Sequence, residues 1–298
     1  MKPALRNELR AFGRDLVPQL LDGTHKLFTE LHGRIEPGAA AVTRDLRYGP
    51  DERHRLDLFR PKTQSAGAKA PMLLFVHGGG FIMGDKSLPG MPFYDNVGRW
   101  AAASGFVGAT MTYRLAPAHP WPAGAEDVGR AVQWLAAHAA EHGGDSGKIF
   151  LMGQSAGAVH AASYLAFPRF QEASRPGVAG AALISGIYDI PSAHRNDFQD
   201  AYFGTDAARF AGQSSLPGLV GTNVPLLFSV SELDGEDFHR QAALVVSGFM
   251  QAGRGYPRML YLQGHNHLSS VLQMGLPEDS LGPQVASFVE AVASGSAE

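Results

Sequence analysis

The chain of 298 residues contains no cysteine. Disulfide bonds, thiolate zinc sites, iron–sulfur clusters and cysteine nucleophiles are therefore excluded. An excess of one charge is also missing, because 25 lysine and arginine residues are balanced by 28 aspartate and glutamate residues, for a formal net charge of −3. A nucleic-acid-binding protein needs surplus basic side chains to neutralise phosphates. The composition thus argues against a nucleic-acid partner.

Long hydrophobic runs are absent as well. The apolar runs fall far short of the roughly 18 residues that a membrane-spanning helix requires, so we expect no membrane span. The opening segment, MKPALRNELRAFGRD, mixes charges every few positions and shows neither an apolar stretch of signal-peptide length nor a small-residue cleavage site. On this missing signal alone, we expect a cytoplasmic protein.

The spacing of hydrophobic residues changes along the chain. In residues 4–32, leucines and a phenylalanine recur at mostly three- or four-residue steps, which predicts helix. Pro18 and Gly23 are expected to divide this segment into two or three pieces. Residues 42–48 and 56–59 then alternate in the manner of two half-buried strands.

Six short apolar runs follow, with helical patterns between them. The runs cover residues 72–77, 106–113, 149–154, 181–186, 225–231 and 258–264. The helical patterns cover about 91–103, 125–141, 156–166, 236–252 and 279–293. Short apolar runs suit strands that are buried on both faces of a parallel sheet, and their alternation with helices predicts a doubly wound α/β sheet.

Residues 190–223 interrupt this alternation of strands and helices, because they are polar and lack a clear strand. Their aromatic residues are Phe198, Tyr202, Phe203 and Phe210. We interpret this stretch as a cap-like insertion that folds over one end of the sheet. The predicted organisation is an N-terminal helical cap segment at 1–38 and a main domain at 39–298.

A nucleophile motif follows the apolar run at 149–152. Residues 153–157 read GQSAG, which is a G-x-S-x-G sequence between a predicted strand and a predicted helix. A nucleophile on such a sharp turn needs neighbours without side chains, so that strand and helix can pass closely. The alternative is a glycine-rich turn that holds an incidental serine. The context favours Ser155 as a nucleophile.

A second glycine-rich segment, HGGGF at residues 77–81, directly follows the strand predicted at 72–77. Consecutive glycines let backbone N–H groups point into one small space, as an oxyanion hole requires. A phosphate-binding loop is the rival interpretation, because residues 79–87 read GGFIMGDKS. That interpretation fails because Asp85 is inserted between the glycine and the lysine.

Together these motifs resemble the α/β-hydrolase superfamily, and within it the hormone-sensitive-lipase-like carboxylesterases and acetyl esterases. The segments YRLAP at 113–117, HPWPA at 119–123 and LRYGP at 46–50 are similar to stretches of that family. The resemblance covers about residues 40–292. It implies an α/β-hydrolase fold with a mostly parallel eight-stranded sheet, helices on both faces and a small cap.

The resemblance also implies a catalytic triad in the chain order serine, acid, histidine. The acid should follow the strand predicted at 225–231, where the candidates are Glu232, Asp234, Glu236 and Asp237. The family pattern matches Asp234. Because Gly235 stands where the family usually has proline, Asp237 remains the second choice.

Two histidines follow the last predicted strand. The family pattern of a histidine before a bulky apolar residue favours His267 as the base, and His265 remains the alternative. A metal site at this His-x-His pair lacks a third ligand at regular spacing. We therefore expect neither a metal nor an organic cofactor.

The remaining site residues are also implied by the resemblance. The N–H groups of Gly79, Gly80 and Ala156 would hold the oxyanion, and His77 would hold the glycine loop in place. Phe81, Ile82 and Tyr188 are expected to line the substrate pocket together with the aromatic residues of 198–210. The alternative is that these aromatic residues form the insertion's own small core.

The function that the sequence predicts is a serine carboxylic-ester hydrolase acting on small or short-acyl esters through an acyl-enzyme. One alternative is an arylformamidase or amidase with the same triad, because residues 234–241 and 184–189 loosely resemble the arylformamidases. The other is a non-catalytic ligand-binding protein of the same fold, such as a plant hormone receptor. The expected partner is a small-molecule ester, and the sequence leaves a homodimer open.

Overall fold

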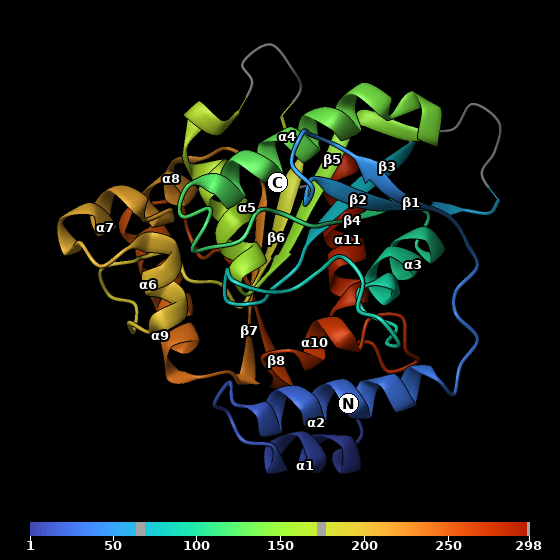
Figure 1. Cartoon of the computed structure of the whole chain (residues 1–298), viewed down its shortest axis with the longest axis horizontal. Helices are drawn as coiled ribbons and strands as arrows, with labels where there is room; N and C mark the ends of the chain where they lie inside the picture. The colour runs from blue at the N-terminus through green and yellow to red at the C-terminus, as the bar shows by residue number, and fades with distance from the viewer. Residues whose placement is uncertain (64–68, 172–176, 297–298) are drawn as a thin grey trace.

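An eight-stranded sheet runs through the centre of the computed structural model, which describes residues 1–63, 69–171 and 177–296 (Figure 1). The strand order is β1-β2-β4-β3-β5-β6-β7-β8. The first two pairs in this order are antiparallel and the other five are parallel. The strands are β1 (Ala40–Arg47), β2 (Arg55–Pro61), β3 (Ala70–Val76), β4 (Val107–Met111), β5 (Gly144–Gln154), β6 (Gly180–Ile184), β7 (Leu226–Leu233) and β8 (Arg258–Asn266).

The central strands are apolar on both faces, as their sequences predict. In β3, Leu74 and Val76 point into one hydrophobic core, whereas Leu73 and Phe75 point into the other. Side chains alternate between the two faces of a strand, so a continuous apolar run supplies both cores at once. This arrangement confirms the predicted α/β class with a mostly parallel sheet.

Helices cover both faces of the sheet. One core contains side chains of α4 (Ala123–His138), α5 (Ala156–Ala166), α8 (Leu216–Gly221) and α9 (Glu236–Gln251). The other core contains side chains of α1 (Pro3–Ala11), α2 (Pro18–His32), α3 (Asp95–Ala103), α10 (Ser269–Leu272) and α11 (Gly282–Ala293). Within the described residues, no helix is long and apolar enough to cross a membrane.

The N-terminal segment forms two helices, because it breaks before Pro18 but not at Gly23. Gly23 lies inside α2, where a Cβ atom would come within 2.9 Å of the ring of Phe12. Glycine at this position thus lets Phe12 pack closely on the helix. Figure 1 shows α1 and α2 below the ends of β7 and β8, where the Nδ2 amide of Asn266 donates to Thr24 Oγ1 at 2.8 Å.

The insertion at 190–223 contains three short helices and no strand. They are α6 (Asp197–Phe203), α7 (Ala207–Gln213) and α8. Helices α6 and α7 contribute Tyr202, Phe203 and Phe210 to a third apolar cluster, which also contains Phe81 of the glycine-rich loop. The insertion therefore packs directly on the loop that follows β3. The roles of the insertion and of residues 1–38 as a cap remain predictions.

Candidate active site

Ser155 occupies the sharp turn between β5 and α5. Its backbone has φ of +54° and ψ of −121°, a left-handed conformation that is strained for a residue with a side chain. A Cβ atom on Gly157 would come within 2.6 Å of the carbonyl oxygen of His77, and one on Gly153 within 2.6 Å of the carbonyl carbon of Gly157. Both motif glycines are therefore required for the close passage of helix and strand that raises Ser155 above the sheet.

The structure brings Ser155, His267 and Asp234 together at the carboxyl ends of three strands. Ser155 Oγ lies 2.8 Å from His267 Nε2, and His267 Nδ1 lies 2.6 Å from Asp234 Oδ1. The side chains of His267 and Asp234 are 2% and 0% exposed. Since a carboxylate only accepts hydrogen bonds, Nδ1–H donates to Asp234, and Nε2 is left to accept the Ser155 hydroxyl proton. This geometry suits a serine activated by a base.

Three further groups hold the acid and the base, and no sequence motif predicts them. Asp234 Oδ2 accepts hydrogen bonds from the hydroxyl of Ser185 and the N–H of Ser231, both at 2.7 Å. The Nε2 amide of Gln154 donates to the carbonyl oxygen of His267 at 2.9 Å. Ser185 directly follows β6, the neighbour of the strand that precedes Asp234, and this strand order is the signal that identifies it.

The alternative acid and base lie elsewhere. Asp237 accepts a hydrogen bond from the N–H of His194 at 3.0 Å. The two ring nitrogens of His265 are paired with the hydroxyls of Ser269 and Ser280, at 3.0 and 2.7 Å. Burial lowers the pKa of His265 to about 4, so this ring is neutral at pH 7. The arrangement favours Asp234 and His267 over Asp237 and His265.

The glycine-rich loop lies against the nucleophile. A Cβ atom on Gly78 would be 3.2 Å from the Cβ atom of Ser155. Gly79 and Gly80 have φ of +131° and +57°, which favour glycine. Within the described residues, their N–H groups donate to no other atom. Ala156 begins α5, and the first N–H groups of a helix lack partners in the helix. These three donors are available to an oxyanion.

His77 has the surroundings of a structural residue. Its ring stacks on Tyr113 with centroids 4.3 Å apart, and Nδ1–H donates to the carbonyl oxygen of Gly78 at 2.6 Å. Burial lowers the pKa of His77 to about 3, which keeps the ring neutral. These contacts fit the loop-holding role that the resemblance implies.

The residues expected to line the pocket lie in two different hydrophobic clusters. The ring of Phe81 stacks on Tyr202 with centroids 4.5 Å apart, and half-buried Ile82 packs on the same cluster. Tyr188 lies instead in the core between sheet and helices, with its ring 5.7 Å from that of Phe228. Its buried ring belongs to this core, and a pocket-lining role for Tyr188 stays a prediction.

Among the aromatic residues of the insertion, Phe198 differs from the others. It is 41% exposed, and its ring lies 3.1 Å from the position of a Cβ atom on Gly80. One turn later on α6, buried Tyr202 has its hydroxyl 3.1 Å from His160 Nδ1 on the nucleophile helix. Tyr202 therefore belongs to the insertion's core, whereas Phe198 borders the site.

The part of the chain that the structure describes offers no cluster of metal ligands at this site. Across residues 1–63, 69–171 and 177–296, no group of three or more histidine, aspartate or glutamate side chains is placed to hold a metal ion. The groups around Ser155 are thus a hydroxyl, an imidazole, a carboxylate and backbone amides.

A sheet of this order, with a serine after β5 and its aspartate and histidine partners after β7 and β8, defines an α/β-hydrolase architecture. Residues 73–250 match the family model described as the alpha/beta hydrolase fold, and the chain belongs to this family. The resemblance inferred from the sequence is confirmed.

The curated relatives carry the names of esterases and carboxylesterases. The chain is 33% identical over 162 residues to esterase LipQ of Mycobacterium tuberculosis, covering 52% of this chain and 37% of that protein. It is 32% identical over 160 residues to probable carboxylesterase 5 of Arabidopsis thaliana, covering 50% and 45%. The matches thus span less than half the length of these relatives.

Solved structures share the fold along nearly the whole chain. Esterase B from Lactobacillus rhamnosis superposes with a TM-score of 0.75 at 17% identity, covering 98% of this chain and 96% of that one. A hyperthermophilic esterase from the archaeon Pyrobaculum calidifontis has a TM-score of 0.70 at 22% identity, covering 99% of each chain. At such identities the likeness concerns the fold.

Proposed function

We propose that the protein is a serine carboxylic-ester hydrolase that acts on small or short-acyl esters through an acyl-enzyme. The observation that carries this proposal is the continuous hydrogen-bonded series Ser155–His267–Asp234 beside the glycine-rich loop. The names of the relatives support ester hydrolysis as the reaction.

In the first half of the reaction, Ser155 Oγ attacks the ester carbonyl carbon while His267 Nε2 takes the hydroxyl proton. Asp234 fixes the imidazole tautomer and stabilises the imidazolium ion. The carbonyl oxygen becomes an oxyanion, held by the N–H groups of Gly79, Gly80 and Ala156. When the bond to the alcohol oxygen breaks, His267 returns the proton to the departing alcohol.

In the second half, water replaces the alcohol. His267 takes a proton from the water as its oxygen attacks the acyl carbon. The same backbone donors stabilise the second oxyanion. Ser155 leaves with the proton from His267, which releases the carboxylic acid and restores the starting state.

The position of α6 supports a preference for short acyl groups. This helix packs on the glycine loop, with Phe198 against Gly80 and Tyr202 against Phe81. Aromatic side chains thus occupy space beside the donors that would hold the substrate oxygen. A small acyl group needs less of this space than a long chain.

The test compares p-nitrophenyl butyrate with p-nitrophenyl palmitate and an N-formyl aryl amine. We expect saturable hydrolysis of the butyrate, with kcat/KM at least about 10-fold above that of either other substrate. Preference for the palmitate would contradict the short-acyl proposal, and preference for the formamide would indicate an arylformamidase. No turnover and no labelling by a fluorophosphonate would indicate the ligand-binding alternative.

One feature of the formamidase resemblance has a structural explanation here. Gln241 is buried, and its side-chain oxygen accepts the backbone N–H groups of Tyr188 and Asp189 at 2.8 and 2.9 Å. This residue therefore fixes the segment after β6. Its presence is explained without a formamide substrate.

Ser185 provides a prediction about the support of the acid. Ser185→Ala should lower kcat/KM for the butyrate by about 10-fold, because a hydrogen bond to a charged group contributes roughly 1.5–3 kcal/mol. Ser231→Ala is the matched control. Its buried hydroxyl has no partner among the described residues, and Asp234 receives only its backbone N–H. Equal loss in both variants would contradict the proposed support.

A further inference from the structure

One side chain from outside the motif is hydrogen-bonded to one end of the glycine-rich loop and is linked through a second residue to the other end. Arg53, in the connection between β1 and β2, donates from Nη2 to the carbonyl oxygen of Gly84 at 2.8 Å. It also donates from Nε to the carbonyl oxygen of Tyr113 at 2.7 Å. The hydroxyl of Tyr113 in turn donates to the carbonyl oxygen of His77 at 2.8 Å. Arg53 thus reaches Gly84 directly and His77 through one intermediate.

These two attachment points bound the segment that carries the oxyanion donors. Gly84 lies directly against the start of the loop, since a Cβ atom there would come within 2.5 Å of the carbonyl oxygen of Gly78. Between them are Gly79 and Gly80, whose conformations are open to few other residues. A loop with this much glycine has little intrinsic stiffness. Two N–H groups inside the loop donate to the carbonyl oxygen of Gly79 and form a turn, so contacts from elsewhere are needed to fix the position of that turn.

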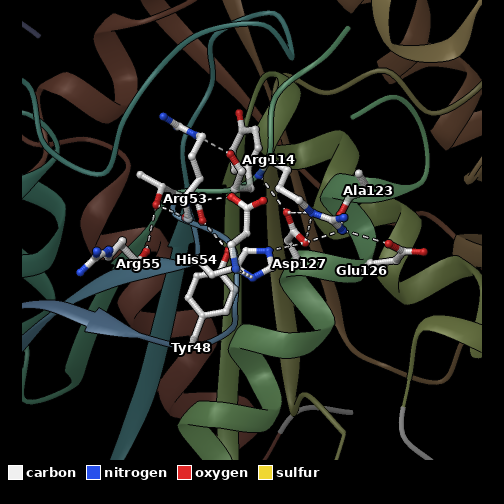
Figure 2. A network of polar contacts seen from close by, with 11 residues as sticks. Tyr48, Arg53, His54, Arg55, Arg114, Ala123, Glu126 and Asp127 are labelled. Atoms are coloured by element: carbon white, nitrogen blue, oxygen red, sulfur yellow. Dashed lines mark hydrogen bonds and ion pairs between the residues drawn. The ribbon is translucent and has the colours of Figure 1, made fainter. Parts of the chain in front are cut away.

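Arg53 is itself held in place. Its backbone N–H donates to the Asp51 carboxylate at 2.9 Å. The next residue, His54, is 2% exposed, and its Nε2 lies 2.9 Å from Oδ1 of fully buried Asp127 on α4. Arg114 Nε donates to the same carboxylate at 2.9 Å. Figure 2 shows this network, with Arg53 and His54 on one side and Arg114 and Asp127 on the other.

The guanidinium group suits this task. It is planar and presents several N–H donors in a rigid fork, so one side chain can bind two carbonyl oxygens in a fixed relation. A lysine ammonium group is a single point on a flexible stem. The third guanidinium nitrogen, Nη1, lies 3.8 Å from the carboxylate of Asp85, the residue after Gly84.

We propose that Arg53 is a positioning residue for the oxyanion hole, which acts by fixing the loop that carries Gly79 and Gly80. This inference depends on the proposed ester hydrolysis. Oxyanion donors contribute most when they are already placed where the charge develops. Loss of Arg53 should therefore reduce the stabilisation of the transition state more than it reduces the binding of the ester.

The experiment measures three quantities for Arg53→Ala and Arg53→Lys with p-nitrophenyl butyrate. They are kcat, KM and the inhibition constant of a short-chain trifluoromethyl ketone, which forms a tetrahedral adduct with an oxyanion. In Arg53→Ala, we expect kcat to fall by about 10- to 100-fold and ketone affinity to fall by the same factor, with KM changed less than about 2-fold. The lysine variant should recover part of both losses.

Arg55→Ala is the matched control. Arg55 is the first residue of β2 and follows Arg53 by two positions, but its side chain donates to the carbonyl oxygens of Glu52 and Asp45. This variant should keep the wild-type kcat and ketone affinity. The pH at which kcat/KM rises should be unchanged in all three variants, because the contacts of His267 and Asp234 remain.

Two outcomes would overturn the inference. One is an Arg53→Ala protein that retains wild-type kcat and ketone affinity. The other is a loss in which KM changes as much as ketone affinity, which indicates general loosening of the fold. If Arg53→Ala does not fold, the same comparison in Arg53→Lys decides. A wild-type protein without esterase activity would instead contradict the proposed function itself.

Discussion

Replacing Ser155 with alanine should lower kcat for p-nitrophenyl butyrate by about 10⁴- to 10⁶-fold. The hydroxyl oxygen of Ser155 is the atom that would form the acyl-enzyme, and it lies 2.8 Å from His267 Nε2. Without it, the reaction is left with the backbone donors and with water as the nucleophile. The measurement is initial rates for both proteins purified side by side.

Two further observations accompany the Ser155→Ala result. Labelling by a fluorophosphonate should disappear, because this reagent requires an activated serine. Thermal unfolding should change little, since the hydroxyl contributes one hydrogen bond at a partly exposed site. Equal turnover by both proteins would show that Ser155 is not the nucleophile.

Asp234→Asn should lower kcat by about 10⁴-fold. The fully buried carboxylate accepts the Nδ1–H of His267 at 2.6 Å. An asparagine amide can donate to Nδ1 instead, which would leave the proton on Nε2, where the base must accept one. The measurement is kcat for p-nitrophenyl butyrate, with circular dichroism to verify the fold.

Asp237→Asn is the companion variant. The Asp237 carboxylate accepts a hydrogen bond from the N–H of His194, and an asparagine side-chain oxygen can accept the same bond. Asp237→Asn should therefore leave kcat close to that of the wild type. If Asp237→Asn abolishes turnover and Asp234→Asn does not, the assignment of the acid is wrong. If both do, the effect concerns the fold of the loop after β7.

The parts of the site that the sequence predicts are those encoded by local geometry. The turn at Ser155 and the glycine loop each need glycines at fixed spacing, because a Cβ atom would collide with neighbouring backbone. The strands were predictable for a similar reason. Burial on both faces leaves a continuous apolar run, as in β3.

Some details of the helices could not be predicted, because each depends on the placement of one side chain. Gly23 lies inside α2 with the ring of Phe12 packed against it, although glycine is a poor helix former. The last helix begins at Gly282 and not at 279, because the Asp279 carboxylate accepts the N–H groups of Leu281 and Gly282. In each case a single side chain in a particular position decides the local structure.

The same limit applies to the supports of the site. Ser185 and Gln154 contact the acid and the base through hydrogen bonds that span 49 and 113 residues of sequence. Arg53 reaches the glycine loop from the connection before β2. Residue type and spacing alone contain no signal for such pairs, because they depend on strand order.

Two of the aromatic residues of α6 beside the glycine loop differ in how deeply they are packed. Tyr202 is 1% exposed and contacts Phe81 and His160, so a change there alters the packing of the insertion and of the nucleophile helix together. Phe198 is 41% exposed and borders Gly80. We therefore expect a smaller side chain at position 198 to cost little stability, whereas the loss of the Tyr202 ring should destabilise the fold. One short helix thus carries both a residue that borders the site and a residue that holds the insertion together.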